Sequence, residues 1–247
     1  MLGILDSGRG GLLTLNMLRR FFKGEDILLL MDKENLPYGR RSLAQLTDIV
    51  SGRLTLLREL GARRAVIGCC TASATYPYLD RELRQFAVPI VEPTARRALS
   101  LSENGRIALL ATESTVAFGA FDRALDCLSL TSVSASPLVR AVEDGEDDLS
   151  VSPNTLSYCR ELIDRASTQG ADTLILGCTH FPALEERLRE LGRERGIRHT
   201  VSSVREGALT ALTAVGEEWQ EEGRDLILST PIDQNQLRLM HLPRGRG

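Results

Sequence analysis

The stretch GARRAVIGCCT at residues 61–71 has a near copy, GADTLILGCTH, at residues 170–180. In each, Gly-Ala opens the stretch, a run rich in Val, Ile and Leu follows, and Gly-Cys closes it. A short apolar run bounded by glycine, after a helical pattern, is typical of a buried parallel strand. We therefore expect one such strand in each half of the chain, with Cys69 and Cys178 just past their carboxyl ends.

Two cysteines in these positions could face each other across a cleft, because residues past the carboxyl ends of parallel strands line the ligand crevice of open α/β sheets. A racemase removes a proton from one face of a carbon and returns a proton to the other face. Two bases on opposite faces do this directly, provided that one is deprotonated while its partner is protonated. The pKa of a cysteine, about 8.5 when unperturbed, can be moved in either direction by its neighbours. The pair Cys69 and Cys178 therefore predicts proton transfer on a bound small molecule.

The spacing of the remaining motifs predicts two related α/β units. Asp6 precedes Cys69 by 63 residues, and Thr112, after another apolar run, precedes Cys178 by 66 residues. Such similar spacing in both halves is typical of two related units. We expect a first domain from residues 1–92 plus 207–247 and a second from residues 93–206, each a mostly parallel sheet flanked by helices. Further strands are expected at residues 2–5, 27–31, 88–92, 106–110, 128–134, 198–202 and 225–229, and helices at 43–60, 71–86, 154–169, 182–195 and 207–222.

Composition narrows the class of protein. The 247 residues are 43% hydrophobic and can bury the cores of two modest domains. A net charge of −3 argues against nucleic acid as the main partner, since phosphate binding requires a concentrated basic surface. Apolar runs such as Ile27–Met31 are far too short to span a membrane. Five cysteines do not make a disulfide framework, so we expect a cytoplasmic protein.

Polar residues gather at the expected strand ends. Asp6 and Ser7 begin a glycine-rich turn before a helix, where free backbone N–H groups can bind an anion. His180 lies two residues past Cys178. Together with Glu143, Asp6 and His180 could orient or charge the thiols. Four hydroxyl groups could bind substrate carboxylates, namely those of Ser7, Thr71, Thr115 and Thr179.

Four motifs in chain order resemble the glutamate racemase family, the cofactor-independent members of the aspartate/glutamate racemase superfamily. The resemblance runs from residue 3 to about residue 220. The motifs are Asp6-Ser7-Gly8, Pro37-Tyr38-Gly39-x-Arg41-Ser42, Cys69-x-Thr71-Ala72-Ser73-Ala74 and Gly177-Cys178-Thr179-His180-Phe181-Pro182.

The resemblance implies that Cys69 and Cys178 are the paired acid–base thiols, acting without a cofactor or metal. It also implies assisting roles for Asp6, His180 and Glu143. A homodimer is expected, whose domains close over the substrate, and whose product D-glutamate supplies peptidoglycan synthesis. The substrate contacts implied are Asp6, Ser7, Tyr38, Gly39, Thr71, Thr115, Thr179 and His180.

The sequence departs from the family pattern inside the expected site. Cys70 occupies a substrate-contact position where the family usually carries asparagine. A thiol is a weak donor and a weak acceptor, so one specific hydrogen bond to substrate should be lost. Phe118 and Phe121 replace the usual serine and tyrosine. These differences leave open a racemase of aspartate or another acidic amino acid, or a binding or regulatory homologue that has lost turnover.

Three further enzyme or site classes fit the sequence less well. A zinc site built from Cys69, Cys70, Cys178 and His180 would lack C-x-x-C spacing. A cysteine phosphatase would need an arginine after either thiol at an offset where none occurs. A pyridoxal racemase needs a Schiff-base lysine, and Lys23 and Lys33, the only lysines, follow a helix and lie in a loop.

Overall fold

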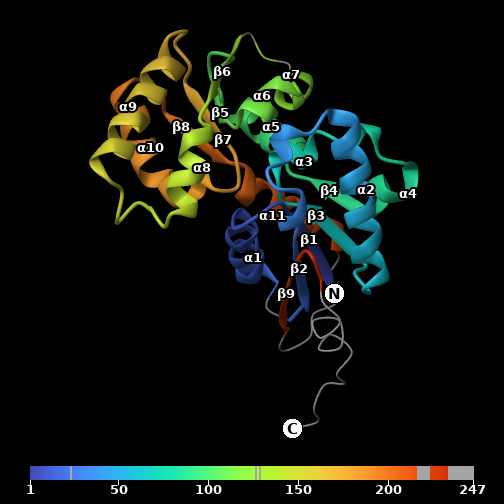
Figure 1. The fold of residues 1–247 in the computed structure, drawn as a ribbon. Helices are drawn as coiled ribbons and strands as arrows, with labels where there is room; N and C mark the ends of the chain where they lie inside the picture. The colour runs from blue at the N-terminus through green and yellow to red at the C-terminus, as the bar shows by residue number, and fades with distance from the viewer. Residues whose placement is uncertain (23, 126, 128, 216–222, 233–247) are drawn as a thin grey trace.

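Two parallel sheets, each flanked by helices, form the computed structural model, which describes residues 1–22, 24–125, 127, 129–215 and 223–232 (Figure 1). The first sheet has the order β4 (Ala87–Pro89), β3 (Arg64–Ile67), β1 (Leu2–Asp6), β2 (Ile27–Met31) and β9 (Asp225–Ser229). The second has the order β6 (Ser129–Ser134), β5 (Arg106–Ala111), β7 (Thr173–Gly177) and β8 (His199–Ser202). All neighbouring strands are parallel, which confirms the predicted α/β fold class.

The central strands are apolar along their whole length because helices cover both faces of each sheet. β1 is buried at every position, as are β2 and β7. On one face of the first sheet, Leu5 and Leu30 pack against Leu46, Val50 and Leu54 of the helix α2 (Leu43–Glu59). The opposite face belongs to a core that continues into the second sheet.

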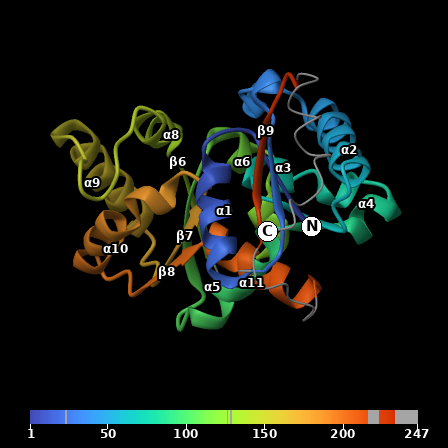
Figure 2. The ribbon, with the colours of Figure 1, turned by 90° about the horizontal axis from the view of Figure 1, so that it is seen from below.

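This shared core joins two lobes, the first built on the sheet that contains β1 and the second on the sheet that contains β5. Helices α5 (Val91–Leu101) and α11 (Ser203–Val215) contact each other (Figure 2); α11 also contacts strands of both sheets, and α5 contacts β7 and β8 of the second sheet. Helix α1 (Gly10–Phe21) packs on α11 from the first lobe. On the far face of the second sheet lie α9 (Pro153–Ser167) and α10 (Glu185–Glu194). The shorter elements are η1 (Lys33–Asn35), η2 (Tyr38–Arg40), α3 (Cys70–Ser73), η3 (Tyr76–Tyr78), α4 (Arg81–Phe86), α6 (Glu113–Ala117), α7 (Ala120–Ala124), α8 (Ser136–Glu143) and η4 (Phe181–Leu184).

Two sequence-based expectations are wrong in detail. The single helix expected at residues 71–86 is three short pieces, because Pro77 interrupts it and Asp80 caps the new helix α4 by accepting from the N–H of Leu83. The strand expected at residues 88–92 ends at Pro89, and α5 begins at Val91. Pro93 then falls in the first helical turn, where a missing N–H is tolerated.

The chain returns to the first sheet at its last strand, as predicted. β9 pairs with β2, with Ile227 opposite Leu29. The helix expected at residues 207–222 begins earlier, at Ser203, and residues 216–222 and the tail from residue 233 lie outside the described residues. The domain limits at residues 92 and 206 stay a prediction. Within the described ranges, every helix is too short or too polar to cross a membrane.

Candidate active site

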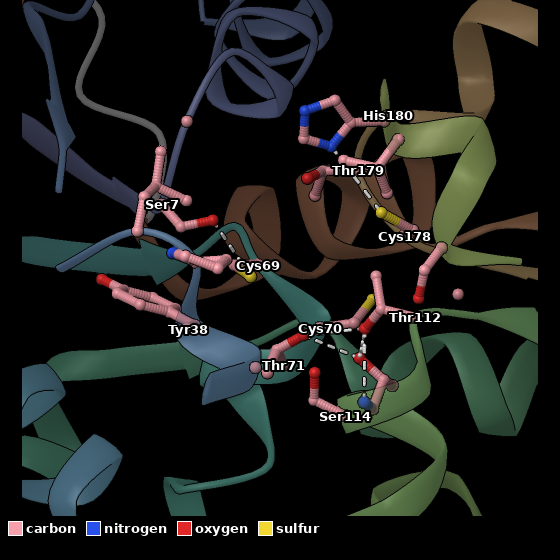
Figure 3. Close-up of a pocket in the computed structure, with 18 of the residues that line it drawn as sticks. Ser7, Tyr38, Cys69, Cys70, Thr71, Thr112, Ser114, Cys178, Thr179 and His180 are labelled. Carbon is pink, nitrogen blue, oxygen red and sulfur yellow. Dashed lines mark hydrogen bonds between the residues drawn. The ribbon is translucent and has the colours of Figure 1, made fainter. Parts of the chain in front are cut away.

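A cavity of about 450 Å³ lies between the lobes at the carboxyl ends of the strands. Cys69 follows β3 of the first sheet and Cys178 follows β7 of the second, and both line this cavity (Figure 3). The remaining lining residues are Ser7, Gly8, Leu36, Pro37, Tyr38, Gly39, Cys70, Thr71, Thr112, Ser114, Thr115, Ser136, Val139, Glu143, Gly177, Thr179 and His180. Two thiols from different sheets therefore share one binding space.

Cys69 sits at the junction of β3 and α3, in extended backbone just before the helical turn. Its side chain is buried, and its Sγ lies 3.8 Å from the Oγ of Ser7. Burial, together with the nearby carboxylate of Asp6, raises the pKa of Cys69 to about 11. Before substrate enters, this thiol is therefore protonated at neutral pH.

Cys178 has a different set of neighbours. Its Sγ lies 3.7 Å from Nδ1 of His180, and Nε2 of the same ring lies 2.6 Å from Oε1 of Glu143. Burial raises the pKa of Cys178, and backbone N–H groups at His180 and Thr179 partly oppose this increase. The imidazole is thus held between a thiol and a carboxylate, an arrangement that fixes its orientation.

Asp6 is fully buried and is not among the residues that line the cavity. Its carboxylate accepts the N–H of Gly8 at 2.9 Å and the hydroxyl of Thr179 at 3.1 Å. Burial raises the pKa of Asp6, and these hydrogen bonds lower it. The bond to Thr179 links the end of β1 in the first lobe to the end of β7 in the second.

Three threonine hydroxyls form a second link between the lobes. Thr71, on α3, lies 2.8 Å from Thr115 and 3.2 Å from Thr112, and the latter two are 2.9 Å apart. Thr112 also caps α6 by accepting the N–H of Thr115. Each hydroxyl has one O–H donor, so the three mutual contacts can use all three donors, and a ligand carboxylate would be bound when a hydroxyl turns from its neighbour and donates to the ligand.

Close approach of the lobes depends on two glycines. A Cβ on Gly39 would overlap the hydroxyl of Ser114, which lies on the opposite lobe. A Cβ on Gly10 would overlap the hydroxyl of Thr179. Glycine at both positions lets backbone from the first lobe contact side chains of the second.

The structure brings eleven of the twelve residues predicted for the site to the cavity wall, with Asp6 behind it. Their roles in binding and proton transfer stay predictions. Thr112, Ser114, Ser136 and Val139 also line the cavity and were not foreseen as site residues. Thr112 was recognisable, because it follows an expected strand, whereas Ser136 and Val139 of α8 gave no comparable signal. Among the described residues, no group of three or more His, Cys, Asp or Glu side chains is placed to hold a metal ion.

The fold, two parallel-sheet lobes with a cavity between them, is that of a racemase family. The family model described as Asp/Glu/Hydantoin racemase matches residues 16–208, so the chain belongs to this family. It is an amino-acid racemase, similar to glutamate racemases. One glutamate racemase, from Desulforudis audaxviator (strain MP104C), is 38% identical over 200 residues, covering 78% of this chain and 71% of the relative.

Two further comparisons extend over most of the chain. The glutamate racemase of Roseiflexus sp. (strain RS-1) is 31% identical over 239 residues, which is 86% of both chains. The crystal structure of glutamate racemase from Thermus thermophilus in complex with β-chloro-D-alanine superposes with a TM-score of 0.78 at 28% identity. That match covers 97% of this chain and 90% of the other, so the likeness includes both lobes.

Proposed function

We propose that the protein interconverts L- and D-glutamate without a cofactor, with Cys69 and Cys178 acting on opposite faces of the α-carbon. The observation that carries this proposal is that both thiols line one cavity from strand ends of different sheets. Glutamate is the substrate named for the relatives at 38% and 31% identity.

The proposed reaction is a proton exchange in two steps. One cysteine, as thiolate, takes the α-proton, so that a C–H bond breaks and an S–H bond forms. The resulting carbanion is then protonated on its other face by the second cysteine, whose S–H bond breaks. Each turnover leaves the two sulfurs with exchanged protonation states, and the reverse reaction restores them.

Both thiols need help to reach the thiolate form, because burial raises the pKa of each. A substrate ammonium group in the cavity would favour the thiolate by direct charge attraction. Asp6 on the Cys69 side and the pair His180–Glu143 on the Cys178 side could accept or return protons of that ammonium group. The threonine cluster would bind a substrate carboxylate.

The cellular role proposed with this activity is the supply of D-glutamate for peptidoglycan, and thereby for cell-wall biogenesis and cell shape. We propose a homodimer in the cytoplasm, whose two domains close over the substrate. Closure would expel water from the cavity and strengthen the electrostatic interactions within it.

Circular dichroism of L- and D-glutamate incubated with the purified protein tests the proposal, with aspartate assayed in parallel. Loss of the signal from both glutamate enantiomers, with solvent deuterium appearing at the α-carbon, is the expected result. Faster conversion of aspartate would indicate the sister activity, which Cys70 makes worth testing. Binding of glutamate without deuterium incorporation would identify a homologue that has lost turnover and would overturn the proposal.

A further inference from the structure

A second carboxylate, that of Asp32, is fully buried near the cavity without lining it. Asp32 follows β2, beside the end of β1. Its oxygens accept hydrogen bonds from Asn35 at 3.0 and 3.1 Å, the Tyr38 hydroxyl at 3.0 Å, Arg53 at 3.0 Å and Thr230 at 2.9 Å. Four side chains from three parts of the chain, namely the segment after β2, helix α2 and the end of β9, therefore converge on one carboxylate.

This arrangement satisfies a charge that would otherwise be costly to bury. An isolated carboxylate in a protein interior is strongly unfavourable, whereas one with a cationic partner and several donors is tolerated. Arg53 supplies the opposite charge through Nε, and its Nη2 bonds to Glu34 at 2.8 Å closer to solvent. The network is thus complete on its own, and it offers no free group to a substrate.

Its connection to the site is the side chain of Tyr38, which is buried and lines the cavity beside Cys69 (Figure 3). Burial and the charge of Asp32 raise the pKa of Tyr38 well above its usual value, so the phenol keeps its proton. That single proton is donated to Asp32. The hydroxyl is therefore committed to Asp32, and the aromatic ring is the part of Tyr38 that faces the cavity.

The Asp32 carboxylate also connects the end of β9 to the segment that carries Tyr38. Thr230, directly after β9, donates its hydroxyl to Asp32 and accepts the N–H of Glu34 at 2.9 Å. Its own N–H donates to the carbonyl of Met31 at 3.0 Å. The segment from Asp32 to Tyr38 is consequently held at its start by β9 and at its end by the phenol.

We propose that Asp32 is a positioning residue of the racemase: it holds the ring of Tyr38 in place as the cavity wall next to Cys69, and Thr230 couples β9 to that support. This inference rests on the proposed function. A general structural role would lower activity independently of Tyr38, whereas a positioning role acts through it.

A double-mutant cycle in kcat/KM separates these two roles. Asp32→Asn keeps the size of the side chain but places an amide NH₂ among groups that donate to Asp32. Tyr38→Phe keeps the ring and removes the hydroxyl. We expect each single variant to lower kcat/KM about tenfold or more, mostly through kcat, because small misplacements at a reacting centre are costly. The double variant should be no worse than the more severe single variant.

Two further variants sharpen the cycle. Glu34→Gln alters the half-exposed partner of Arg53 outside the buried network and should leave kcat and KM unchanged. Thr230→Val removes one donor to Asp32 and should cause a smaller loss of kcat, which disappears in the Tyr38→Phe background. Losses that multiply in the double variants, or an Asp32→Asn enzyme with wild-type kinetics, would overturn the inference.

An NMR measurement on enzyme labelled with [13Cζ]tyrosine tests the contact without relying on turnover. Tyr38→Phe identifies the Tyr38 resonance, which should shift in Asp32→Asn and stay in place in Glu34→Gln. If the wild-type enzyme does not racemise glutamate, the proposed function fails, and this resonance still decides the structural part of the inference. A resonance that Asp32→Asn leaves unmoved overturns it.

Discussion

The carboxyl ends of β3 and β7 carry the same Gly-Cys step, yet the two cysteines have different neighbours. Cys69 lies beside the hydroxyl of Ser7 and the charge of Asp6. Cys178 lies beside His180, which is bonded in turn to Glu143. The repeat thus places a thiol at each strand end, while His180 at the end of its second copy and residues outside the repeat give the two thiols different neighbours.

This difference matters because the two ends must do different things in each half of the reaction. While one thiol accepts a proton, the other must hold one. Burial and the charge of Asp6 raise the pKa of both thiols, whereas only Cys178 has an imidazole beside it that can exchange a proton with its neighbours. Unequal surroundings are a means of keeping the two protonation states apart.

The largest effect is expected from removing either thiol. Cys69→Ala and Cys178→Ala should each reduce racemisation in both directions by about 10³-fold or more, because one face of the α-carbon then lacks its acid or base. Circular dichroism with either enantiomer measures this. Cys159→Ala, in the core of the second lobe, is the matched control and should retain turnover. Full two-way turnover by Cys178→Ala would contradict the two-thiol assignment.

Substitution of an assisting residue, Asp6 or His180, should lower kcat/KM about 10²-fold. The isotope effect should show which of the two cysteines each residue assists. The enantiomers have equal free energies, so any variant must lower kcat/KM equally in both directions. The difference should appear in the primary isotope effect of α-deuterated glutamate. His180→Asn should raise this effect in the direction in which Cys178 abstracts the proton and lower it in the other. Asp6→Asn should do the reverse.

Glu143→Gln should follow His180→Asn in sign, because Glu143 acts on Cys178 through the imidazole. Isotope effects that change alike in both directions for both sides would show that the two ends are equivalent in catalysis. The different neighbours of Cys69 and Cys178 would then have no separate roles in proton transfer.

Much of this site could be predicted from the sequence because strand ends are local features. An apolar run that ends in Gly-Cys identifies both the strand and the position of its thiol, and parallel pairing brings such ends to one edge. Thr71, Thr179 and His180 follow directly. The return of β9 to the first sheet was also predicted, from the apolar run within Asp225–Ser229, and its pairing with β2 confirms the prediction.

Other features depend on tertiary contacts that leave no mark on local sequence. The acidic stretch around Glu143 has the composition of a solvated surface, so the prediction for Glu143 depended on the family resemblance, and its bond to His180 requires the packing of α8. The network around Asp32 joins residues almost 200 positions apart, through the bond from Thr230. Pro77 in the sequence indicates a break in the helix, but the start of α4 after Asp80 depends on the hydrogen bond from the N–H of Leu83 to the Asp80 side chain.

The free energy of unfolding at alkaline pH should distinguish Cys69 from Cys178. Burial raises the pKa of Cys69 from 9.0 to about 11 and raises that of Cys178 as well. The folded state therefore retains protons that the unfolded state loses, and stability present below pH 9 falls as pH rises. Each thiol should change the unfolding equilibrium constant about tenfold per pH unit over this window.

Urea unfolding at several pH values measures this loss in the wild type and in Cys69→Ala. The difference between the two proteins should grow from pH 9 and level off near pH 11, where the native Cys69 ionises. The corresponding difference for Cys178→Ala should not level off there. A stability that stays flat between pH 8 and 10 would contradict the buried, protonated state of both thiols.

A substitution that holds the lobes apart should lower kcat/KM by about tenfold, because the two cysteines then no longer reach the substrate together. Gly39→Ala places a methyl group against the hydroxyl of Ser114 and should hold the lobes apart. We expect a lower kcat/KM, restored in part when Ser114→Gly is added, because that change removes the obstacle. Gly52→Ala is the control, since a Cβ there meets no neighbouring atom and racemisation should be unchanged. Failure of the second substitution to restore activity would show that the loss arises elsewhere.

The residues directly after the two cysteines give the smallest and most specific effect. Thr179 follows Cys178 and donates to Asp6, whereas Cys70 follows Cys69 with a buried thiol whose pKa burial raises well above its usual value. A neutral thiol is a weak hydrogen-bonding group, so this end contributes little direct recognition. Cys70→Asn adds an amide donor and acceptor to the cavity wall. The KM for glutamate should fall a few-fold, while Cys70→Ala leaves it near the wild-type value. If Cys70→Asn instead favours aspartate over glutamate, the cavity is matched to the shorter acid, and Cys70 is part of that selection.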